Sequence, residues 1–484
     1  MSAGAGRRPR RFDANLVVIG AGSAGLVSAS VAAAARAKVV LIEAGRMGGD
    51  CLNTGCVPSK ALLRSARIAA QMRRAADFGV VAGPVTVDFA GVMARVASVI
   101  ERIAPHDSVE RYTKLGVECL SGAATLLSPW EVGVGSRVIS TRAIVLATGA
   151  SPALPPLAGR DAADPLTAAN LWALRELPRR LLVLGGGPQG CEFAQAFRQL
   201  GSEVTLVEMQ SQLLAQEDAE VGAALAARFT REGISVLTGW RALAVGQPGE
   251  LRIGRDGASR VAGFDRILVA TGRSPRTTGL GLERVGVGLN PDGTVQVNEF
   301  LQTTRPNIYA CGDVAGPYQL THAAAHQAWY CATNALFGAL RRSRIDYAVL
   351  PRVVFTDPEV ARVGLNETQA RERGIRCETT RYGFDDLDRA IADGTTEGFI
   401  KVLTPPGSDR ILGATIVGPH AGELIAEFAL AMRHGLGLRK VLGTIHSYPT
   451  FAEANRFTAL AWQRTRLPAT LLGIAGHFHR WRRG

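Results

Sequence analysis

The chain lacks a regular cysteine framework and has no apolar run typical of a transmembrane helix. Its seven cysteines are an odd number without the spacing of a disulfide-stapled extracellular domain. We therefore expect a reducing compartment, the cytoplasm, in which a disulfide is usually catalytic. Charged residues make up 20% of the 484 residues and apolar residues 47%, which is typical of a globular protein of about three domains.

The chain has fewer acidic than basic side chains: 42 Asp and Glu against 55 Lys and Arg, which gives a net charge of +13. The arginines are scattered except for RRPRR near the start and HRWRRG at the finish. This distribution is typical of a solvated surface with basic tails, and it predicts no nucleic-acid partner. The segment LVVIGAGSAGLVSASVAAAA follows basic residues as an export signal does, but its glycines fit a nucleotide-binding turn better.

Two cysteines separated by four residues stand out in the segment GGDCLNTGCVPSKALL. Cys51 and Cys56 come just before a predicted helix, and Lys60 lies four residues further on. A thiolate here is stabilised by the positive end of the helix and by the lysine, which makes it reactive. A half zinc site or two unrelated buried cysteines are the alternatives, but the other cysteines offer no second ligand pair. We predict a redox-active pair.

A second pattern occurs twice: an apolar strand, a glycine-rich turn, a helix and a strand that ends in glutamate. In both copies, 15–43 and 180–208, the acid follows the first glycine by 23 positions. The first glycine permits the tight turn, the second lets backbone amides approach a pyrophosphate, the third lets the helix pack on the strand, and the acid accepts hydrogen bonds from a ribose. We predict two dinucleotide sites, formed by Gly20, Gly22, Gly25 and Glu43 and by Gly185, Gly187, Gly190 and Glu208.

Each copy is followed by another apolar strand that ends in the tripeptide ATG. The first of these strands ends at Thr148 and Gly149 and the second at Gly272, and each is expected to close its own dinucleotide-binding domain. Glu208 is followed by Met209 and a glutamine, with no arginine to receive a 2′-phosphate. The second site therefore favours NAD over NADP.

The cysteine pair decides which nucleotide occupies which site. The first copy leads directly into Cys51 and Cys56, so its ligand must exchange electrons with a dithiol. A flavin accepts hydride from a nicotinamide and passes the electron pair to a disulfide, which a nicotinamide alone does not readily do. We expect FAD in the first site and NAD(H) in the second.

The chain resembles the class I pyridine nucleotide-disulfide oxidoreductases, the family of dihydrolipoamide dehydrogenase, glutathione reductase and mercuric reductase, over roughly residues 14–465. The motifs that carry the resemblance occur in family order: GAGSAG, GGDCLNTGCVPSK, ATGASP, GGGPQGCE, ATGRSP, ACGDVAG, TDPEVARVG and HSYPTFAEA. It implies an α/β fold with two Rossmann-like dinucleotide-binding domains and a C-terminal α+β dimerisation domain. The expected segments are 14–155 and 278–348 for the FAD domain, 156–277 for the NAD(P) domain, 349–466 for dimerisation and 467–484 for a basic tail.

The resemblance also implies roles for single residues. Cys56 is implied to face the flavin and Cys51 to exchange with substrate. Lys60 is implied to lie near flavin N5 and to pair with Glu192, as a buried cation that stabilises the reduced flavin. The FAD side is implied to include Thr148, Gly149, Gly312, Asp313 and Thr321, with Asp313 on the ribityl side, and the NAD side to include Glu192 and Gly272.

The chain departs from the family at the end of the dimerisation domain. Members that act on dithiols carry a histidine before Pro-Thr, backed by a glutamate, and this histidine takes the proton of the substrate thiol. Here Tyr448 fills that position, Glu453 keeps the partner position and His446 lies two residues upstream. A tyrosine, with an ordinary pKa near 10, is a poor base at neutral pH. His446 is therefore considered as a displaced base and, equally, as a supporting residue.

The sequence predicts a homodimeric, NADH-dependent disulfide oxidoreductase similar to dihydrolipoamide dehydrogenase, with a small disulfide, a dithiol or a lipoyl domain as partner. Mercuric reductase resembles the chain in its tyrosine, but no cysteine follows Cys377 to deliver a metal and no N-terminal CxxC domain is present. A transhydrogenase or NADH:quinone-type flavoprotein would not need the cysteines. A subunit that mainly binds a multienzyme complex is the alternative from another class.

The last segment, 454–484, predicts two helical pieces divided at Pro468. The second piece combines apolar residues with arginines at its end. Such a helix packs its apolar side on its own domain in most proteins, which is the expectation here, and contact with a membrane surface is the alternative. Its apolar residues are Leu471, Leu472, Ile474 and Phe478.

Overall fold

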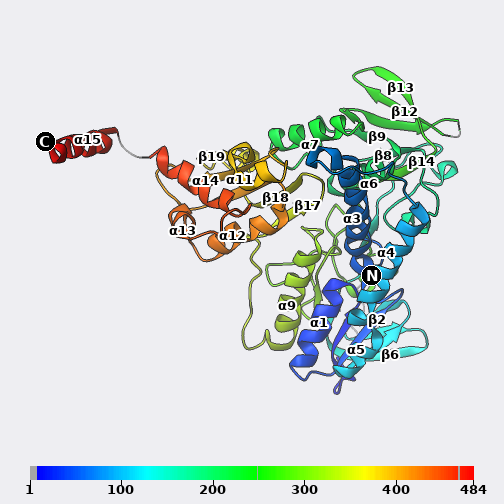
Figure 1. The fold of residues 1–484 in the computed structure, drawn as a ribbon. Coiled ribbons are helices and arrows are strands. Elements are labelled where there is room, and N and C mark those ends of the chain that lie inside the picture. Colours follow the sequence, from blue (N-terminus) through cyan, green and yellow to red (C-terminus); the bar gives the residue numbers. More distant parts are fainter. Residues whose placement is uncertain (1–7, 248, 467–468) are drawn as a thin grey trace. The chain divides into compact units, whose positions relative to one another are not determined.

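The computed structural model describes residues 8–247, 249–466 and 469–484. The chain forms two compact units, each assembled from segments that are distant in sequence and therefore differ in colour in Figure 1. The first unit consists of the chain up to Gly185 with 196–207 and 241–346, and the second of 186–195, 208–240 and the chain from Tyr347 on.

The main sheet of the first unit is built on the apolar strands that the sequence predicted. β1 (Ala14–Ile19) lies between β2 (Val39–Glu43) and β6 (Arg137–Leu146), and all three run parallel. Most of their residues are buried, as expected for parallel strands with both faces covered. Two parallel strands and an antiparallel hairpin complete this sheet: β3 (Val117–Ser121), β16 (Ile308–Ala310), β4 (Ala124–Ser128) and β5 (Glu131–Val134).

The glycine turn after β1 determines how α1 (Ser23–Ala34) meets the sheet. Gly20 has a φ of +102°, a left-handed conformation that side chains rarely adopt. A Cβ added at Gly25 would lie 1.7 Å from the carbonyl oxygen of Gly20, so only glycine lets the helix start this close to the turn. α1 packs along α9 (Thr321–Phe337), and the two helices lie side by side in Figure 1.

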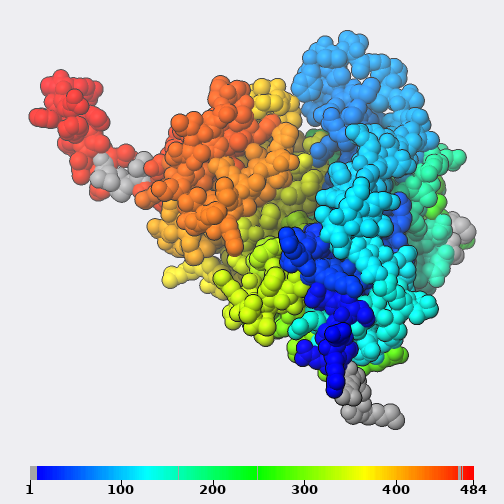
Figure 2. Space-filling view, turned by 90° about the horizontal axis from the view of Figure 1, so that it is seen from below, coloured from blue at the N-terminus to red at the C-terminus, as the bar shows by residue number. Residues whose placement is uncertain are grey.

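The cysteine segment forms two consecutive helices. α2 (Gly49–Asn53) carries Cys51, and α3 (Cys56–Arg73) begins at Cys56. α3 packs against α4 (Phe89–Ile103), and the outward side of α4 is exposed within the light-blue to cyan surface of Figure 2. The small helices α5 and α8 of this unit are Val109–Lys114 and Leu282–Val285.

The second copy of the nucleotide pattern repeats the plan of the first. β8 (Arg180–Leu184) pairs in parallel with β9 (Glu203–Glu208) and β14 (Arg266–Val269), and α6 (Pro188–Leu200) connects β8 to β9. Gly185 has a positive φ, as its counterpart in the first copy has. Antiparallel strands accompany this part: β11 (Arg241–Val245), β12 (Glu250–Arg255), β13 (Ala258–Gly263), β7 (Ala150–Pro152) and β15 (Arg273–Pro275).

The second unit contains an antiparallel sheet with helices packed on it. Its strand order is β17 (Arg352–Val354), β18 (Glu359–Gly364), β21 (Gly413–Gly418), β20 (Phe399–Thr404), β19 (Glu378–Gly383). A core that includes Phe384, Phe428 and Trp462 is buried there. Lys401, which is also buried, donates to Asp218 at 2.6 Å and ties the sheet to the start of α7. This unit also contains β10 (Ser235–Thr238) and α7 (Ala219–Arg231). Its further helices are α10 (Glu367–Glu372), α11 (Asp388–Ala392), α12 (Ala421–Arg433), α13 (Leu438–Gly443) and α14 (Glu453–Arg464).

The final helix is α15 (Ala469–Arg483). The break expected at Pro468 lies outside the described residues, and so does the side chain of Leu471. Across the described part of the chain, every helix is too short or too polar to cross a bilayer.

Candidate functional site

The two cysteines of the motif lie together with the first residue of a helix from far along the chain. Cys56 opens α3, and its Sγ lies 3.1 Å from Oγ1 of Thr321, the first residue of α9. Cys51 interacts directly with Cys56 and reaches Thr321 and Ser23 as well. Both cysteines are free thiols, with Cys56 exposed and Cys51 partly covered. Three helix N-termini, those of α1, α3 and α9, therefore surround the two sulfur atoms, and each favours negative charge.

Ionisation of Cys51 is disfavoured by its surroundings. The hydrogen bond to Cys56 and then burial raise the pKa of Cys51 far above its ordinary value. A thiol that donates to a neighbouring sulfur loses that bond when it ionises, and burial disfavours the charged form. Cys51 therefore keeps its proton at neutral pH.

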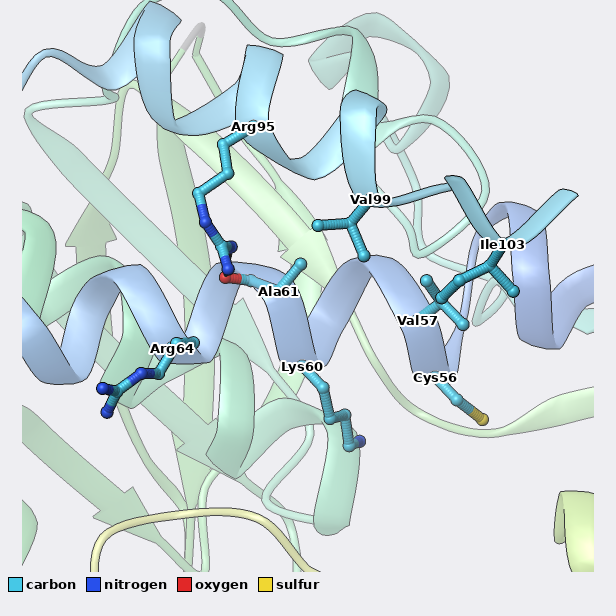
Figure 3. A pocket seen from close by; sticks show the side chains of 8 residues that line it. All are labelled: Cys56, Val57, Lys60, Ala61, Arg64, Arg95, Val99 and Ile103. Atoms are coloured by element: carbon cyan, nitrogen blue, oxygen red, sulfur yellow. Dashed lines mark hydrogen bonds between the residues drawn. The ribbon is translucent and has the colours of Figure 1, made fainter. Parts of the chain in front are cut away.

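A hollow of about 340 Å³ opens beside Cys56 between α3 and α4. Figure 3 shows that the apolar side chains of Val57, Val99 and Ile103 gather between the two helices, while Lys60 and Arg64 point away from α4. Arginine and lysine are the charged residues in its lining. The full lining is Cys56, Val57, Lys60, Ala61, Arg64, Arg95, Val99 and Ile103.

The first glycine turn has the form of a pyrophosphate cradle. No side chain caps the N-terminus of α1, so its amides stay available to an anion. A Cβ at Gly22 would meet nothing closer than 3.7 Å, so the protein itself does not require glycine there. Glu43 accepts from the amides of Ala21 at 2.5 Å and Gly45 at 2.7 Å. A carboxylate has further lone pairs, and the half-exposed Glu43 can therefore still accept from a ribose.

The second glycine turn uses its acid in the same way. Glu208 accepts from the amide of Gly186 at 2.5 Å with one oxygen and from the amide of Gln210 at 2.6 Å with the other. A Cβ at Gly187 would find no atom within 4 Å. Both turns therefore leave space where a dinucleotide backbone would pass, and both fit the cofactors expected from the sequence.

Charged residues that the sequence did not single out connect the cysteine segment to the end of β16. Arg273 forms an ion pair with Asp50, the residue before Cys51, and its Nε lies 3.1 Å from Oδ2 of Asp313. Arg276 also reaches Asp50, at 3.2 Å. Burial raises the pKa of Asp313, and Arg273 opposes that shift. The available signal was the pair of arginines directly after the second ATG strand.

The remaining FAD-side residues lie at strand and helix ends. Gly312 has a positive φ, and a Cβ there would come within 3.2 Å of Ala24 on α1 and 3.4 Å of Ala324 on α9. Thr148 donates through Oγ1 to the carbonyl of Arg276 at 2.7 Å. Gly149 and Gly272, its counterpart on the NAD side, follow the ends of β6 and β14, and both have a positive φ, as expected of a turn glycine.

Lys60 and Glu192 are each described in their own unit. Lys60 is half-buried, and its Nζ donates to Oγ of Ser59 at 3.3 Å. Glu192 lies in the first turns of α6, is buried and accepts from the amide of Phe355 at 3.0 Å. Gly190, two residues before Glu192, lies in the same helix.

The C-terminal candidates hold different partners. The hydroxyl of Tyr448, 72% exposed, donates to Asp388 at 2.9 Å, and that hydrogen bond raises its pKa. Tyr448 therefore stays protonated at neutral pH and acts as a donor.

His446 has both ring nitrogens occupied, Nδ1 by the carbonyl of Thr444 at 3.1 Å and Nε2 by Glu427 at 3.0 Å. Glu453 is buried and accepts from the amide of Thr450 at 3.2 Å. In the described unit, both residues hold the turn that presents Tyr448.

Comparison with known proteins agrees with this geometry. The family model described as "Pyridine nucleotide-disulphide oxidoreductase" matches residues 14–328, and the dimerisation domain of the same family matches 350–458. A dihydrolipoyl dehydrogenase from Chlamydia muridarum is 38% identical over 92% of this chain and 96% of its own. A mercuric reductase from Streptomyces lividans is 36% identical over 92% and 95%.

Solved structures show the same fold. LpdA from Mycobacterium tuberculosis has a TM-score of 0.83 at 27% identity and covers 94% of this chain and all of its own. The HOCl-induced flavoprotein disulfide reductase RclA from Escherichia coli has a TM-score of 0.81 at 28% identity over 92% and 98%. The chain belongs to the pyridine nucleotide-disulphide oxidoreductase family and is an FAD-dependent disulfide oxidoreductase that works with NAD(H).

Proposed function

We propose that the protein reduces a small disulfide of the lipoyl type with electrons from NADH, through a disulfide that forms between Cys51 and Cys56. The observation that carries the proposal is that Cys51 and Cys56 interact directly beside Thr321, whose Oγ1 lies 3.1 Å from Sγ of Cys56. FAD, when bound, transfers the electron pair between the nicotinamide and the cysteine disulfide. The overall balance is NADH, one proton and one substrate disulfide giving NAD⁺ and two thiols.

The two cysteines divide the thiol exchange. Cys51 attacks one sulfur of the substrate disulfide and releases the other as a thiol, and Cys56 then attacks the sulfur of Cys51 and releases the second thiol. Cys51 must lose its proton before it attacks, because the nucleophile is the thiolate, and its raised pKa means that this step needs a base. The positive end of α3 favours a thiolate on Cys56 when it leaves the disulfide.

The proton that Cys51 gives up needs a receiver. The bound hydroxyl of Tyr448 suits a donor that stabilises the leaving thiolate rather than a base. His446 and Glu453 support the turn that carries Tyr448 through their hydrogen bonds. The exposure of Tyr448 favours a role in the site of the second subunit, and the dimerisation domain supports a homodimer.

The remaining assignments follow the family. Glu43, Asp313 and Thr321 would hold FAD, and Glu208 would hold the ribose of NAD(H). Lys60 would pair with Glu192 beside the flavin. We propose 14–155 and 278–348 as the FAD domain, 156–277 as the NAD domain, 349–466 as the dimerisation domain and 467–484 as a basic tail, with the protein acting in the cytoplasm.

The hollow between α3 and α4 is the proposed entry for the aliphatic part of the substrate. Val57, Val99 and Ile103 offer apolar walls beside Cys56. The names of the similar dihydrolipoyl dehydrogenases support a lipoyl disulfide as substrate, and the arginines of the lining suit a carboxylate at its end.

The test counts thiols in denatured protein before and after anaerobic addition of NADH. Seven cysteines less the two of the bridge leave five thiols in the oxidised holoenzyme, and NADH should raise the count to seven. Cys51→Ser and Cys56→Ser should each give six thiols in both conditions and lose lipoamide turnover by at least about 1000-fold. Cys377→Ser, distant from the motif in sequence, is the matched control and should gain two thiols as the parent does.

Three results contradict the proposal. A count of seven without NADH means that no bridge forms. Full turnover in Cys51→Ser means that the cysteines are not used, which favours a quinone or transhydrogenase reaction. If the protein reduces Hg²⁺ but none of lipoamide, lipoate and glutathione disulfide, its substrate is a metal ion and not a disulfide.

A further inference from the structure

The apolar side chains of α15 lie uncovered. Ile474 is 65% exposed, Phe478 49% and Trp481 76%. The sequence favoured packing of this face on its own domain, and the described side chains contradict that expectation. Figure 2 shows the red surface of this helix.

Ile474, Phe478 and Trp481 lie on one face of the helix, whereas Leu472, 57% exposed, falls on the side of Arg480 and Arg483. Ile474, Phe478 and Trp481 are spaced by four and three positions, which places them one above another in an α-helix, and the rings of Phe478 and Trp481 lie 6.1 Å apart. Arg480 and Arg483 fall on the opposite face by the same spacing rule. A helix of 15 residues is about 22 Å long, too short to cross a bilayer but long enough to lie on one.

Charge separates the candidate occupants of this face. Residues 454–484 contain six arginines and no acidic residue. A second copy of the chain carries the same net charge of +13, so charge disfavours it as the surface that covers the helix. A surface of negative charge with an apolar layer beneath it complements both faces.

The helix is also separate from the parts that carry the redox chemistry. The dimerisation-domain model ends its match at residue 458, before α15 begins at Ala469. The family match therefore assigns no role to α15, and its role is inferred from its own apolar and charged side chains.

We propose that α15 is an interfacial helix that binds the protein to anionic lipid bilayers. Ile474, Phe478 and Trp481 enter the boundary between headgroups and acyl chains, and Arg480, Arg482 and Arg483 bind lipid phosphates. The attraction between arginines and lipid charge is screened by salt. Binding is therefore reversible and is weaker at high ionic strength.

The test is sedimentation of the FAD-loaded full chain with vesicles of phosphatidylcholine alone or with 30% phosphatidylglycerol. We expect binding to the anionic vesicles only, and loss of most of it at about 0.5 M salt. Phe478→Ser with Trp481→Ser should weaken binding by at least about tenfold. Replacing the three arginines by glutamine should weaken it by about 100-fold.

Matched controls separate this surface from general effects. Val81→Ser removes an apolar side chain elsewhere that is even more exposed, at 99%. Arg10→Gln with Arg11→Gln removes charge from the other basic stretch. Both variants should bind as the parent does. NADH-dependent lipoamide turnover should be unchanged in all variants. Equal binding of the Phe478/Trp481 variant overturns the proposal, as does the absence of binding by the parent. A change in oligomeric state without a change in vesicle binding assigns the face to a second copy.

Discussion

The glycine turns after β1 and β8 have the same pattern of hydrogen bonds between a glutamate and backbone amides, but their surroundings differ. In each, one carboxylate oxygen accepts from the amide after the first glycine and the other from an amide two residues past the acid. The residue after the first glycine is Ala21 in one turn and Gly186 in the other. A Cβ at Gly186 would come within 2.9 Å of Glu208 and 2.8 Å of Leu213, so the second turn is more closely covered by its own chain.

The helices that follow differ more strongly. Two positions past the third glycine, α1 carries Val27 and α6 carries Glu192, which is buried and holds the amide of Phe355. The first turn leads into Cys51, whereas no cysteine pair follows the second. The same backbone arrangement thus occurs in both turns, and under the proposed function the residues that follow it determine which nucleotide exchanges electrons with the cysteines.

The largest expected difference is between Gly25, the packing glycine of the first turn, and Gly187, the glycine of the second turn that faces the pyrophosphate. Gly25→Ala places a Cβ 1.7 Å from the carbonyl oxygen of Gly20, and a clash with backbone costs about 1–3 kcal/mol or more. We expect loss of bound flavin, measured as absorbance at 450 nm per chain, and a lower melting temperature. Gly187→Ala, with no atom within 4 Å of its Cβ, should keep flavin and stability and raise the KM for NADH. Retention of full flavin by Gly25→Ala would contradict the packing argument.

A smaller effect should separate the two acids. Glu43→Gln and Glu208→Gln keep the side-chain shape but replace one of the two amide-accepting oxygens by a donor, at a cost of about 1.5–3 kcal/mol. We expect Glu43→Gln to weaken FAD binding by about 10–100-fold with an unchanged KM for NADH, and Glu208→Gln to do the reverse. Flavin release under dilution and steady-state kinetics measure the two. Equal loss of both ligands in either variant would mean that the turns are not independent.

The smallest effect concerns nucleotide choice in the second turn. Met209, which follows Glu208, is 55% exposed, and Met209→Arg would place a guanidinium where a 2′-phosphate of NADP binds. We expect the ratio of kcat/KM for NADPH to that for NADH to rise by about tenfold. Met209→Leu, which adds no charge, should leave the ratio unchanged. A parent enzyme that already prefers NADPH would contradict the assignment.

The sequence placed Cys51 and Cys56 just before a helix, whereas Cys51 lies inside α2 and Cys56 is the first residue of α3. The strands and the glycine turns could be predicted because each is set by neighbours along the chain, through apolar runs and glycine spacing. The contact of Cys56 with Thr321 and the ion pairs of Arg273 could not, because they depend on how distant strands end at one edge of a sheet. His446 illustrates the same limit. Its sequence position allowed a base, but Glu427, from another helix, occupies its Nε2.

The site around Cys56 has a consequence for how the protein is made. Thr321 is 265 residues downstream of Cys56, so the ribosome needs on the order of 10–50 s to add it after the cysteine emerges in sequence. Through that interval the N-terminal thiols exist without α9 beside them, and Asp313 is also still missing. If Thr321 and Asp313 hold FAD as proposed, flavin loading follows the synthesis of α9, and until then the cysteine segment relies on cellular reductants to avoid disulfides with other proteins.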